Sequence, residues 1–403
     1  MSSDMKSKTN INRKLFTIHS WLGLVLGIIY CLISIGGASI VFYGELNEFL
    51  YGDNIRIEKT GEKKLSYDQL YQIARKEYPN SMFINIAYDP NYPENAYSIT
   101  GMEEQPMNLF ENGRFHNDYV NPYTGEIIFR TDSSFTGNIL VWLDSLHASL
   151  RLGTGGAVIV GVMSVMVVLS LITGLIFYRK FIVKVLLFRV KVKFKNWRTA
   201  SSDLHRVIGT WALIVNLLIF GSGFYMYYAL FTPSWWKENW PPKHAEVVVP
   251  KIAVSLDSLV EKSKALIPEM IPSSISIMHD TSELISVYGM TNQKLYLDAD
   301  NYGFVEFKSD GTVKESYHKQ WADFTGVEKF DNINFTLLHT GWALGLTGKI
   351  LWTFFGFAPA ILSITGFALW WRKKKFFQRK SKSPSMQRGT QETKVAPASK
   401  SIL

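Results

Sequence analysis

Four of the eight histidines stand at repeated positions beside long apolar segments. His19 and His205 each precede a glycine by four residues, and an apolar run follows. His147 and His339 each follow a leucine and precede a glycine by six residues, again ahead of an apolar run. An imidazole can carry a proton or bind a metal through a ring nitrogen. Because a titratable ring is costly beside a membrane span, its repetition indicates that it is used.

The histidines belong to a duplication that keeps its register over long distances. A shift of 192 residues carries His147 to His339, and the same shift carries the I-T-G at 172–174 to the I-T-G at 364–366. A shift of 186 residues relates the other two histidines and also carries Gly37 to Gly223. A lone histidine at a span terminus is more often an anchor or a packing residue. Four in two matched registers favour a shared chemical role.

Four apolar stretches are long enough to cross a bilayer, which takes about 20 apolar residues. They lie at roughly 17–44, 155–178, 205–231 and 346–371. Basic residues precede the first stretch, as in a signal peptide, but it is too long and runs into Phe42 and Tyr43 instead of a small-residue cleavage site. We therefore expect an uncleaved anchor and a bundle of four transmembrane helices.

Basic residues indicate the orientation of these spans. Residues 1–14 hold four basic residues and one acidic residue, 179–206 hold nine and one, and 372–403 hold ten and one. These segments should face the cytoplasm, which leaves the acidic loops 45–137 and 232–336 outside. The net charge of +9 follows from this topology and needs no nucleic-acid partner. The basic stretch 181–198 should lie against anionic membrane lipid.

Each outer loop is large enough for a small domain. In each, a helical pattern ended by proline precedes short strand-like runs. The first loop has the helix at 66–78 and runs at 81–88 and 95–100; the second has the helix at 255–267 and runs at 273–278, 283–288 and 295–298. The predicted fold class is therefore a membrane α-helical bundle of four spans with two α+β domains inserted between spans 1 and 2 and spans 3 and 4.

The predicted organisation follows from these assignments. Its parts are a cytoplasmic N-terminus (1–14), transmembrane helix 1 (15–44), a first outer domain (45–137), an outer histidine segment with transmembrane helix 2 (138–180), a basic cytoplasmic loop (181–203), transmembrane helix 3 (204–231), a second outer domain (232–336), an outer histidine segment with transmembrane helix 4 (337–372) and a basic, disordered cytoplasmic tail (373–403).

Topology sorts the four histidines into two pairs. His19 and His205 fall at the inner ends of their spans, whereas His147 and His339 fall at the outer ends. Two imidazoles facing across a bundle suit the axial positions of a haem iron. Neither pair has the third ligand that zinc or copper sites usually take. With no C-x-x-C-H motif, the sequence predicts two non-covalent b-type haems and no other metal.

The outer histidines should stand on short segments of their own. From His147 to Tyr178 is 31 residues, or about 46 Å of helix at 1.5 Å per residue, which exceeds the ~30 Å hydrocarbon core. The G-T-G-G run at 153–156 should break this helix, and the L-G-L-T-G run at 344–348 should do the same after His339. An outer haem would then lie close to the membrane surface, within reach of a bulky substrate.

Several motifs resemble one known family. VNPYTGEII at 120–128 resembles the D-P-Y-T-G-E turn of PepSY domains, with Asn121 in place of Asp, whereas 295–307 in the second loop keeps only Asp298 and Gly303. The H-x-W-x-G opening at His19, the L-H-R-x-x-G opening at His205, the L-H-x5-G segments and the I-T-G endings complete the pattern over about 13–375. In order and orientation the chain resembles the PepSY-associated transmembrane family.

The resemblance implies a bacterial inner-membrane protein, because members include siderophore-iron reductases that pass electrons through two haems to periplasmic ferric complexes. The inner haem (His19, His205) would take electrons from a separate donor, a reductase or a quinol, because the sequence has no dinucleotide-binding fingerprint. The outer haem (His147, His339) would reduce ferric siderophore held between the outer domains and release Fe(II). No catalytic residue is assigned in those domains.

One alternative comes from a different class of protein. The chain could be a non-catalytic membrane module whose PepSY domains bind and regulate a periplasmic protease or sensor, in which case the four histidines only pack. The remaining histidines, His116, His244, His279 and His318, lie in the outer loops and are predicted to be surface or fold residues.

Overall fold

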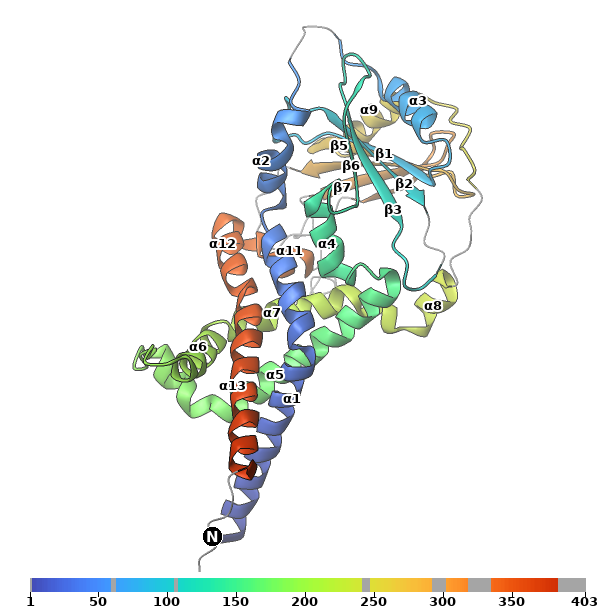
Figure 1. The fold of residues 1–403 in the computed structure, drawn as a ribbon. Coiled ribbons are helices and arrows are strands. Elements are labelled where there is room, and N and C mark those ends of the chain that lie inside the picture. Colours follow the sequence, from blue (N-terminus) through green and yellow to red (C-terminus); the bar gives the residue numbers. More distant parts are fainter. Residues whose placement is uncertain are drawn as a thin grey trace, which may run out of the picture.

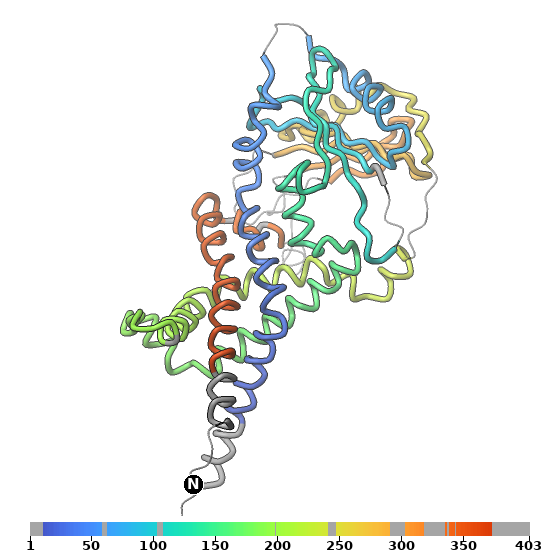
Figure 2. Tube along the Cα trace, viewed as in Figure 1, coloured from blue at the N-terminus to red at the C-terminus, as the bar shows by residue number. Residues whose placement is uncertain are grey.

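The computed structural model describes residues 2–58, 63–104, 108–240, 247–291, 302–317 and 335–382. A bundle of long helices lies below an antiparallel sheet in Figure 1. The chain begins at the end of the bundle farthest from the sheet, and α1 (Ser2–Ile40) rises through the bundle toward α2 (Tyr43–Ile55), which lies beside the sheet (Figure 2).

Within the described residues, four helical stretches are long and apolar enough to cross a membrane: Ile11–Ile40, Gly153–Leu186, Leu213–Phe231 and Gly345–Arg372. Apolar side chains on their outer surfaces are widely exposed, for example Ile28 at 76%, Ile214 at 73% and Phe354 at 71%. Such surfaces suit contact with lipid, where exposed apolar side chains carry no penalty. The prediction of a membrane protein with four spans is therefore confirmed.

Two of the predicted spans consist of two helices each. The third is divided at Ala212 into α6 (Trp197–Trp211) and α7 (Leu213–Tyr227), which continues as the short turn η1 (Tyr228–Phe231). The fourth is divided at Phe357 into α12 (Gly345–Gly356) and α13 (Ala358–Lys382). Pro359 explains the second division, because proline has no N–H for a helix interior.

Helix α13 also changes the predicted tail. Residues 373–382 continue this helix instead of beginning a disordered segment, since lysine, arginine and glutamine are good helix formers. Residues 383–403 lie outside the described part of the chain.

The outer histidines lie on short helices. His147 is on α4 (Ile139–Ser149), which ends before α5 (Gly153–Leu186), and His339 is on α11 (Phe335–Thr340), which is followed by the short turn η3 (Trp342–Leu344) and α12. Residues with positive φ make both breaks: Leu150, Arg151 and Gly153 in the first, Gly341 and Gly345 in the second. The first break falls at 150–152, just before the predicted glycine run, whose later glycines lie inside α5.

All eight described strands form one antiparallel sheet in the order β4-β3-β2-β1-β5-β6-β7-β8. The first loop supplies β1 to β4 (Phe83–Ala87, Tyr97–Glu104, Arg114–Val120 and Ile127–Asp132). The second supplies β5 to β8 (Met270–Met278, Ile285–Thr291, Tyr302–Phe307 and Val313–Tyr317). Strands β1 and β5 pair from Phe83↔Met278 to Ala87↔Ser274, so the two α+β units share a single sheet.

Two helices cover one face of this sheet. They are α3 (Tyr67–Glu77) and α9 (Leu256–Leu266), and each comes from one loop, as the helical patterns predicted. Their core is fully buried, with Leu70, Ile84, Leu256 and Ile275 at 0% exposure. Ser66 and Gln69 form a reciprocal capping box that fixes the start of α3.

The other predicted local features can be compared with the observed strands and turns. The runs predicted at 81–88, 95–100, 273–278 and 283–288 coincide with β1, β2, β5 and β6, whereas the run at 295–298 lies outside the described residues. The predicted turn after β3 is present: Gly125 has φ +77°, and its N–H donates to the carbonyl of Asn121 at 2.8 Å. The remaining short helix, α8 (Pro233–Asn239), follows η1.

Candidate functional site

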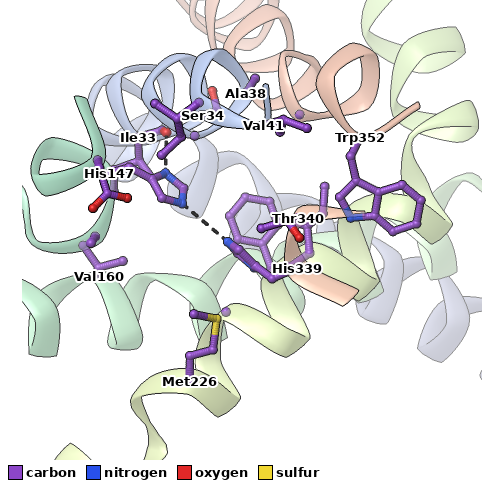
Figure 3. A pocket seen from close by; sticks show the side chains of 18 of the residues that line it. Ile33, Ser34, Ala38, Val41, His147, Val160, Met226, His339, Thr340 and Trp352 are labelled. Carbon is purple, nitrogen blue, oxygen red and sulfur yellow. Dashed lines mark hydrogen bonds between the residues drawn. The ribbon is translucent and has the colours of Figure 1, made fainter. Parts of the chain in front are cut away.

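The two histidines nearest the sheet face each other inside the bundle. Nε2 of His147 lies 3.4 Å from Nε2 of His339, and the ring centroids are 5.8 Å apart with planes at 40°. Figure 3 shows both rings directed into one cavity from different helices. We call these two residues the sheet-proximal pair.

A backbone carbonyl fixes each ring of this pair. Nδ1 of His147 lies 2.8 Å from the carbonyl oxygen of Ile33 on α1, and Nδ1 of His339 lies 2.8 Å from that of Ile219 on α7. A carbonyl can only accept, so each Nδ1 carries the proton and each Nε2 presents its lone pair. Two lone pairs that face each other at this distance need a cation or a proton between them. This is the second-shell arrangement common to metal-binding histidines.

Glycines make room for both rings. A Cβ at Gly37 would lie 2.5 Å from Nδ1 of His147, and a Cβ at Gly223 would lie 3.0 Å from Cε1 of His339. The contact at Gly37 is closer than packed atoms allow, and the contact at Gly223 would require the ring of His339 to shift by a few tenths of an ångström. The register that relates these glycines in the sequence therefore places each of them against a histidine ring.

A cavity of about 460 Å³ surrounds the sheet-proximal pair. This volume lies within the ~300–1,000 Å³ range of small-molecule and cofactor sites. Most of the lining is apolar, including Ile33, Val160 and Trp352 (Figure 3), but Asp144 and Asn216 also line it. Asn216 is 1% exposed, and its Oδ1 has no hydrogen-bond partner among the described residues.

The other two histidines form a second pair, farther from the sheet. The rings of His19 on α1 and His205 on α6 have centroids 6.3 Å apart and planes at 85°. Nδ1 of His19 lies 3.0 Å from the carbonyl oxygen of Ser170, and Nδ1 of His205 lies 3.0 Å from Oγ1 of Thr365. The cavity beside this sheet-distal pair is about 70 Å³.

Glycines also pack against the sheet-distal pair, although less tightly. A Cβ at Gly174 would lie 3.3 Å from Cε1 of His19, and a Cβ at Gly366 would lie 3.4 Å from Cε1 of His205. These glycines are the last residues of the two I-T-G motifs, and Thr365 is the middle residue of the second. The I-T-G motif that was predicted to end the second and fourth spans therefore supplies contacts to the histidine rings.

The two halves of the chain contribute equally to the two pairs. His147 is held by α1 and His19 by α5, both in the first half, whereas His339 is held by α7 and His205 by α13, both in the second. Each half therefore orients its own two rings, and each pair joins one ring from each half. The structure brings together the four residues in the combination that topology predicted.

In the part of the chain that the structure describes, no three or more His, Cys, Asp or Glu side chains gather in a group that could hold a metal ion. Each pair consequently offers two nitrogens, a donor set that suits an ion already held by other ligands.

Two of the remaining histidines are buried in the sheet region. His279 is 0% exposed, with Nδ1 2.6 Å from the carbonyl of Ser81 and Nε2 2.9 Å from the hydroxyl of Tyr71. His116 stacks on Tyr78 with centroids 3.2 Å apart, and burial lowers its pKa to about 4. Both fit the predicted role of fold residues. His244 and His318 lie outside the described residues.

One family profile matches most of the chain. No curated protein matches the chain. The profile of the PepSY-associated TM region matches residues 16–373, which includes most of the first span, the other three spans, both histidine pairs and the eight strands. The chain therefore belongs to the PepSY-associated transmembrane family.

Proposed function

We propose that this protein carries electrons across a bacterial inner membrane through two non-covalent b-type haems and reduces ferric siderophore in the periplasm. The observation that carries the proposal is the pair of neighbouring imidazoles found twice, each ring held through Nδ1 by a partner on another helix. Fixed, paired imidazoles across a helical bundle are what axial haem ligation requires.

The sheet-proximal site fits a haem both in the two nitrogen atoms that it offers and in the volume of its cavity. The two Nε2 atoms stand 3.4 Å apart, so His147 and His339 would hold the iron between them after a small separation of the rings. The cavity of about 460 Å³ and its apolar lining suit a porphyrin. Gly37 and Gly223 leave both rings free to lie flat against α1 and α7.

The sheet-distal site fits in donor chemistry but not in volume. The rings lie with centroids 6.3 Å apart and are held through Nδ1 as in the other pair, but the cavity of about 70 Å³ is far below the ~300 Å³ lower range of cofactor pockets. Haem at this site would require neighbouring side chains such as Leu175 and Leu213, which line the cavity, to move apart.

Two centres at these positions would lie at different depths of the membrane. Fourteen residues separate His19 from Ile33, the residue whose carbonyl holds His147, and fourteen also separate His205 from Ile219. At 1.5 Å per residue this is about 21 Å along α1, a large part of the ~30 Å hydrocarbon core.

Charge supports the orientation in which the sheet lies in the periplasm. The described parts of the three basic segments lie away from the sheet (Figure 1), whereas the loops that form it are acidic. Both termini would then be cytoplasmic, and the sheet-proximal pair would lie near the periplasmic surface.

When bound, haem supplies a one-electron couple between Fe(III) and Fe(II). The residues of this chain would hold the ligand rings, exclude water with apolar helices and keep the rings from rotating. One electron from a cytoplasmic reductase or a membrane quinol would convert one substrate Fe(III) to Fe(II). Oxygen-donor chelators bind Fe(II) less tightly than Fe(III), so the metal would be released.

Absorbance of the purified protein tests the proposal. The reduced-minus-oxidised spectrum should show b-type haem, and a pyridine-haemochrome assay should give two haems per chain. In proteoliposomes with an internal reductant, ferrous iron should appear outside when ferric siderophore is supplied. A protein without any haem band would instead support the non-catalytic module that binds a protease or sensor.

A further inference from the structure

A loop of the sheet reaches the break between α4 and α5. The loop joins β2 to β3 and is described at residues 108–113, which we call the contact loop; β3 descends from the sheet toward the start of α5 in Figure 1. The carbonyl of Leu109 accepts the N–H of Gly155 at 2.7 Å, and Oδ1 of Asn112 accepts the N–H of Gly153 at 2.8 Å. Both donors lie in the first turn of α5, where N–H groups have no partner within the helix.

Asn112 joins the two helices on either side of this break. Its Nδ2 donates to Oγ of Ser145 on α4 at 3.4 Å, while its Oδ1 holds Gly153 on α5. Ser145 stands two residues before His147 in the same helix. One side chain from the sheet therefore spans the break and holds both of its ends.

Two glycines allow the contact loop to come this close to α5. A Cβ at Gly153 would lie 2.2 Å from the carbonyl oxygen of Glu111, and a Cβ at Gly155 would lie 2.4 Å from the ring of Phe110. Neither distance is possible between packed atoms. The glycine run at 153–156, from which the sequence predicts a helix break, is thus the place where the sheet rests on α5.

The backbone between α4 and α5 needs support from outside. Leu150, Arg151 and Gly153 have φ of +52°, +57° and +52°, a region in which residues with side chains are strained. Such strain persists only where the surrounding structure holds it in place. Besides Asn112, the carbonyl of Ser133 accepts a hydrogen bond from Nη1 of Arg151 at 3.0 Å. Ser133 follows β4, so both of these supports come from the sheet region.

The corresponding break beside His339 is supported in another way. Nε1 of Trp352 on α12 donates to the carbonyl of Leu338 at 2.8 Å. The same ring lies against Gly341, where a Cβ would be 2.6 Å from it. Among the described contacts, the break after α11 is therefore held by the span that follows it, whereas the break after α4 is held by the sheet.

We propose that the contact loop positions the ring of His147, with Asn112 as the positioning residue, so that the sheet sets the geometry of one member of the sheet-proximal pair. This inference rests on the proposed function, because it takes His147 as an axial ligand of haem iron. A tilt of α4 would move this ring relative to Ile33 and His339, whose contacts with it are 2.8 Å and 3.4 Å. The orientation and hydrogen bonding of an axial imidazole tune the potential of the iron.

Redox titration of the purified, full-length protein tests the inference. Asn112→Leu removes both side-chain hydrogen bonds, so it should shift the midpoint potential of the centre that His147→Ala removes and leave the other centre unchanged. Asn112→Asp keeps an oxygen for the N–H of Gly153 and should cause a smaller shift. Asn91→Leu is the matched control and should shift neither potential, because Asn91 lies between β1 and β2 and its side chain donates within that turn, to Asp89.

The contact between Phe110 and Gly155 gives a second measurement with its own rescue. Gly155→Ala places a methyl group against the ring of Phe110, and it should shift the same potential as Asn112→Leu. Phe110 is 55% exposed, so Phe110→Ala alone should leave both potentials nearly unchanged. In the Phe110→Ala background the methyl group has room, and Gly155→Ala should then have little further effect, a coupling that a double-mutant cycle measures.

Hydrogen exchange on the same variants reports on the contact loop independently of haem. The backbone amide of Gly153 should exchange about threefold to tenfold faster in Asn112→Leu, as the loss of one hydrogen bond allows. It should exchange at the original rate in Asn91→Leu.

Two results would overturn the inference. One is unchanged potentials and unchanged exchange in Asn112→Leu, and the other is an equal shift of both centres, which would indicate a general loss of stability. Haem with two unaltered potentials contradicts the positioning role alone. Absence of haem contradicts the proposed function, and the exchange of Gly153 then decides by itself whether the contact loop holds the break.

Discussion

The two histidine pairs share their chemistry but differ in the space around them. Both have rings held through Nδ1 by a neighbouring helix, and both have a glycine against each ring. The cavity is about 460 Å³ at the sheet-proximal pair and about 70 Å³ at the sheet-distal pair. The duplication therefore fixes how the histidine rings are held, and the local helix geometry fixes how much room they enclose.

The positions of the helix breaks account for this difference. The sheet-proximal rings stand on α4 and α11, short helices that end at residues with positive φ and diverge from the spans that follow. His19 instead lies within a continuous span, and His205 lies on α6 directly before α7. Short helices set against long ones leave a gap between layers, whereas parallel packing of long helices closes it.

The largest effect should come from filling the space at the sheet-proximal pair. Gly37→Ala places a methyl group against the ring of His147, and overpacking of this severity costs about 3 kcal/mol. We expect haem content to fall from two per chain to one. Gly23→Ala is the control, because nothing lies within 4 Å of a Cβ there. Two haems retained in Gly37→Ala would mean that the ring moves freely and that the glycine register is incidental.

The same change at the sheet-distal pair should have a smaller effect. A Cβ at Gly174 lies 3.3 Å from His19, so a shift of a few tenths of an ångström accommodates it. The expected cost is about 1 kcal/mol, roughly a fivefold loss of haem affinity. Haem titration of the apoprotein measures it. If Gly174→Ala lost a haem as completely as Gly37→Ala, the difference in tightness between the pairs would be refuted.

The smallest effect on haem binding should come from the threonines beside the sheet-distal pair, and it should differ between the two halves of the chain. Thr365→Val removes the hydroxyl that bonds Nδ1 of His205, whereas the corresponding Thr173 bonds only backbone carbonyls of its own helix. We expect Thr365→Val to weaken haem binding about threefold, as loss of one weak hydrogen bond to the ring does, and to shift the midpoint potential of that centre. Thr173→Val should leave both unchanged. Equal shifts in the two variants would show that the threonines act only on helix packing.

Much of this arrangement could be predicted because it depends on local patterns. The spans follow from hydropathy, and the pairing of His19 with His205 and of His147 with His339 follows from topology. The glycine runs predicted that helices break after His147 and His339, although the first break falls at 150–152, just before its run. The pairing of β1 with β5 could not be predicted, because it joins strands about 190 residues apart and leaves no local signal. The division at Ala212, the unpartnered Asn216 and the unequal cavities likewise depend on packing between distant helices.

The central claim is that each centre takes one ring from each half of the duplication. Reduced-minus-oxidised spectra and haem content of four single variants, His19→Ala, His205→Ala, His147→Ala and His339→Ala, test it most directly. The first two should lose one and the same centre, and the last two should lose the other, leaving two kinds of residual spectrum. If His147→Ala and His339→Ala removed different centres, or if a folded single variant lost both, the pairing across the halves would be contradicted.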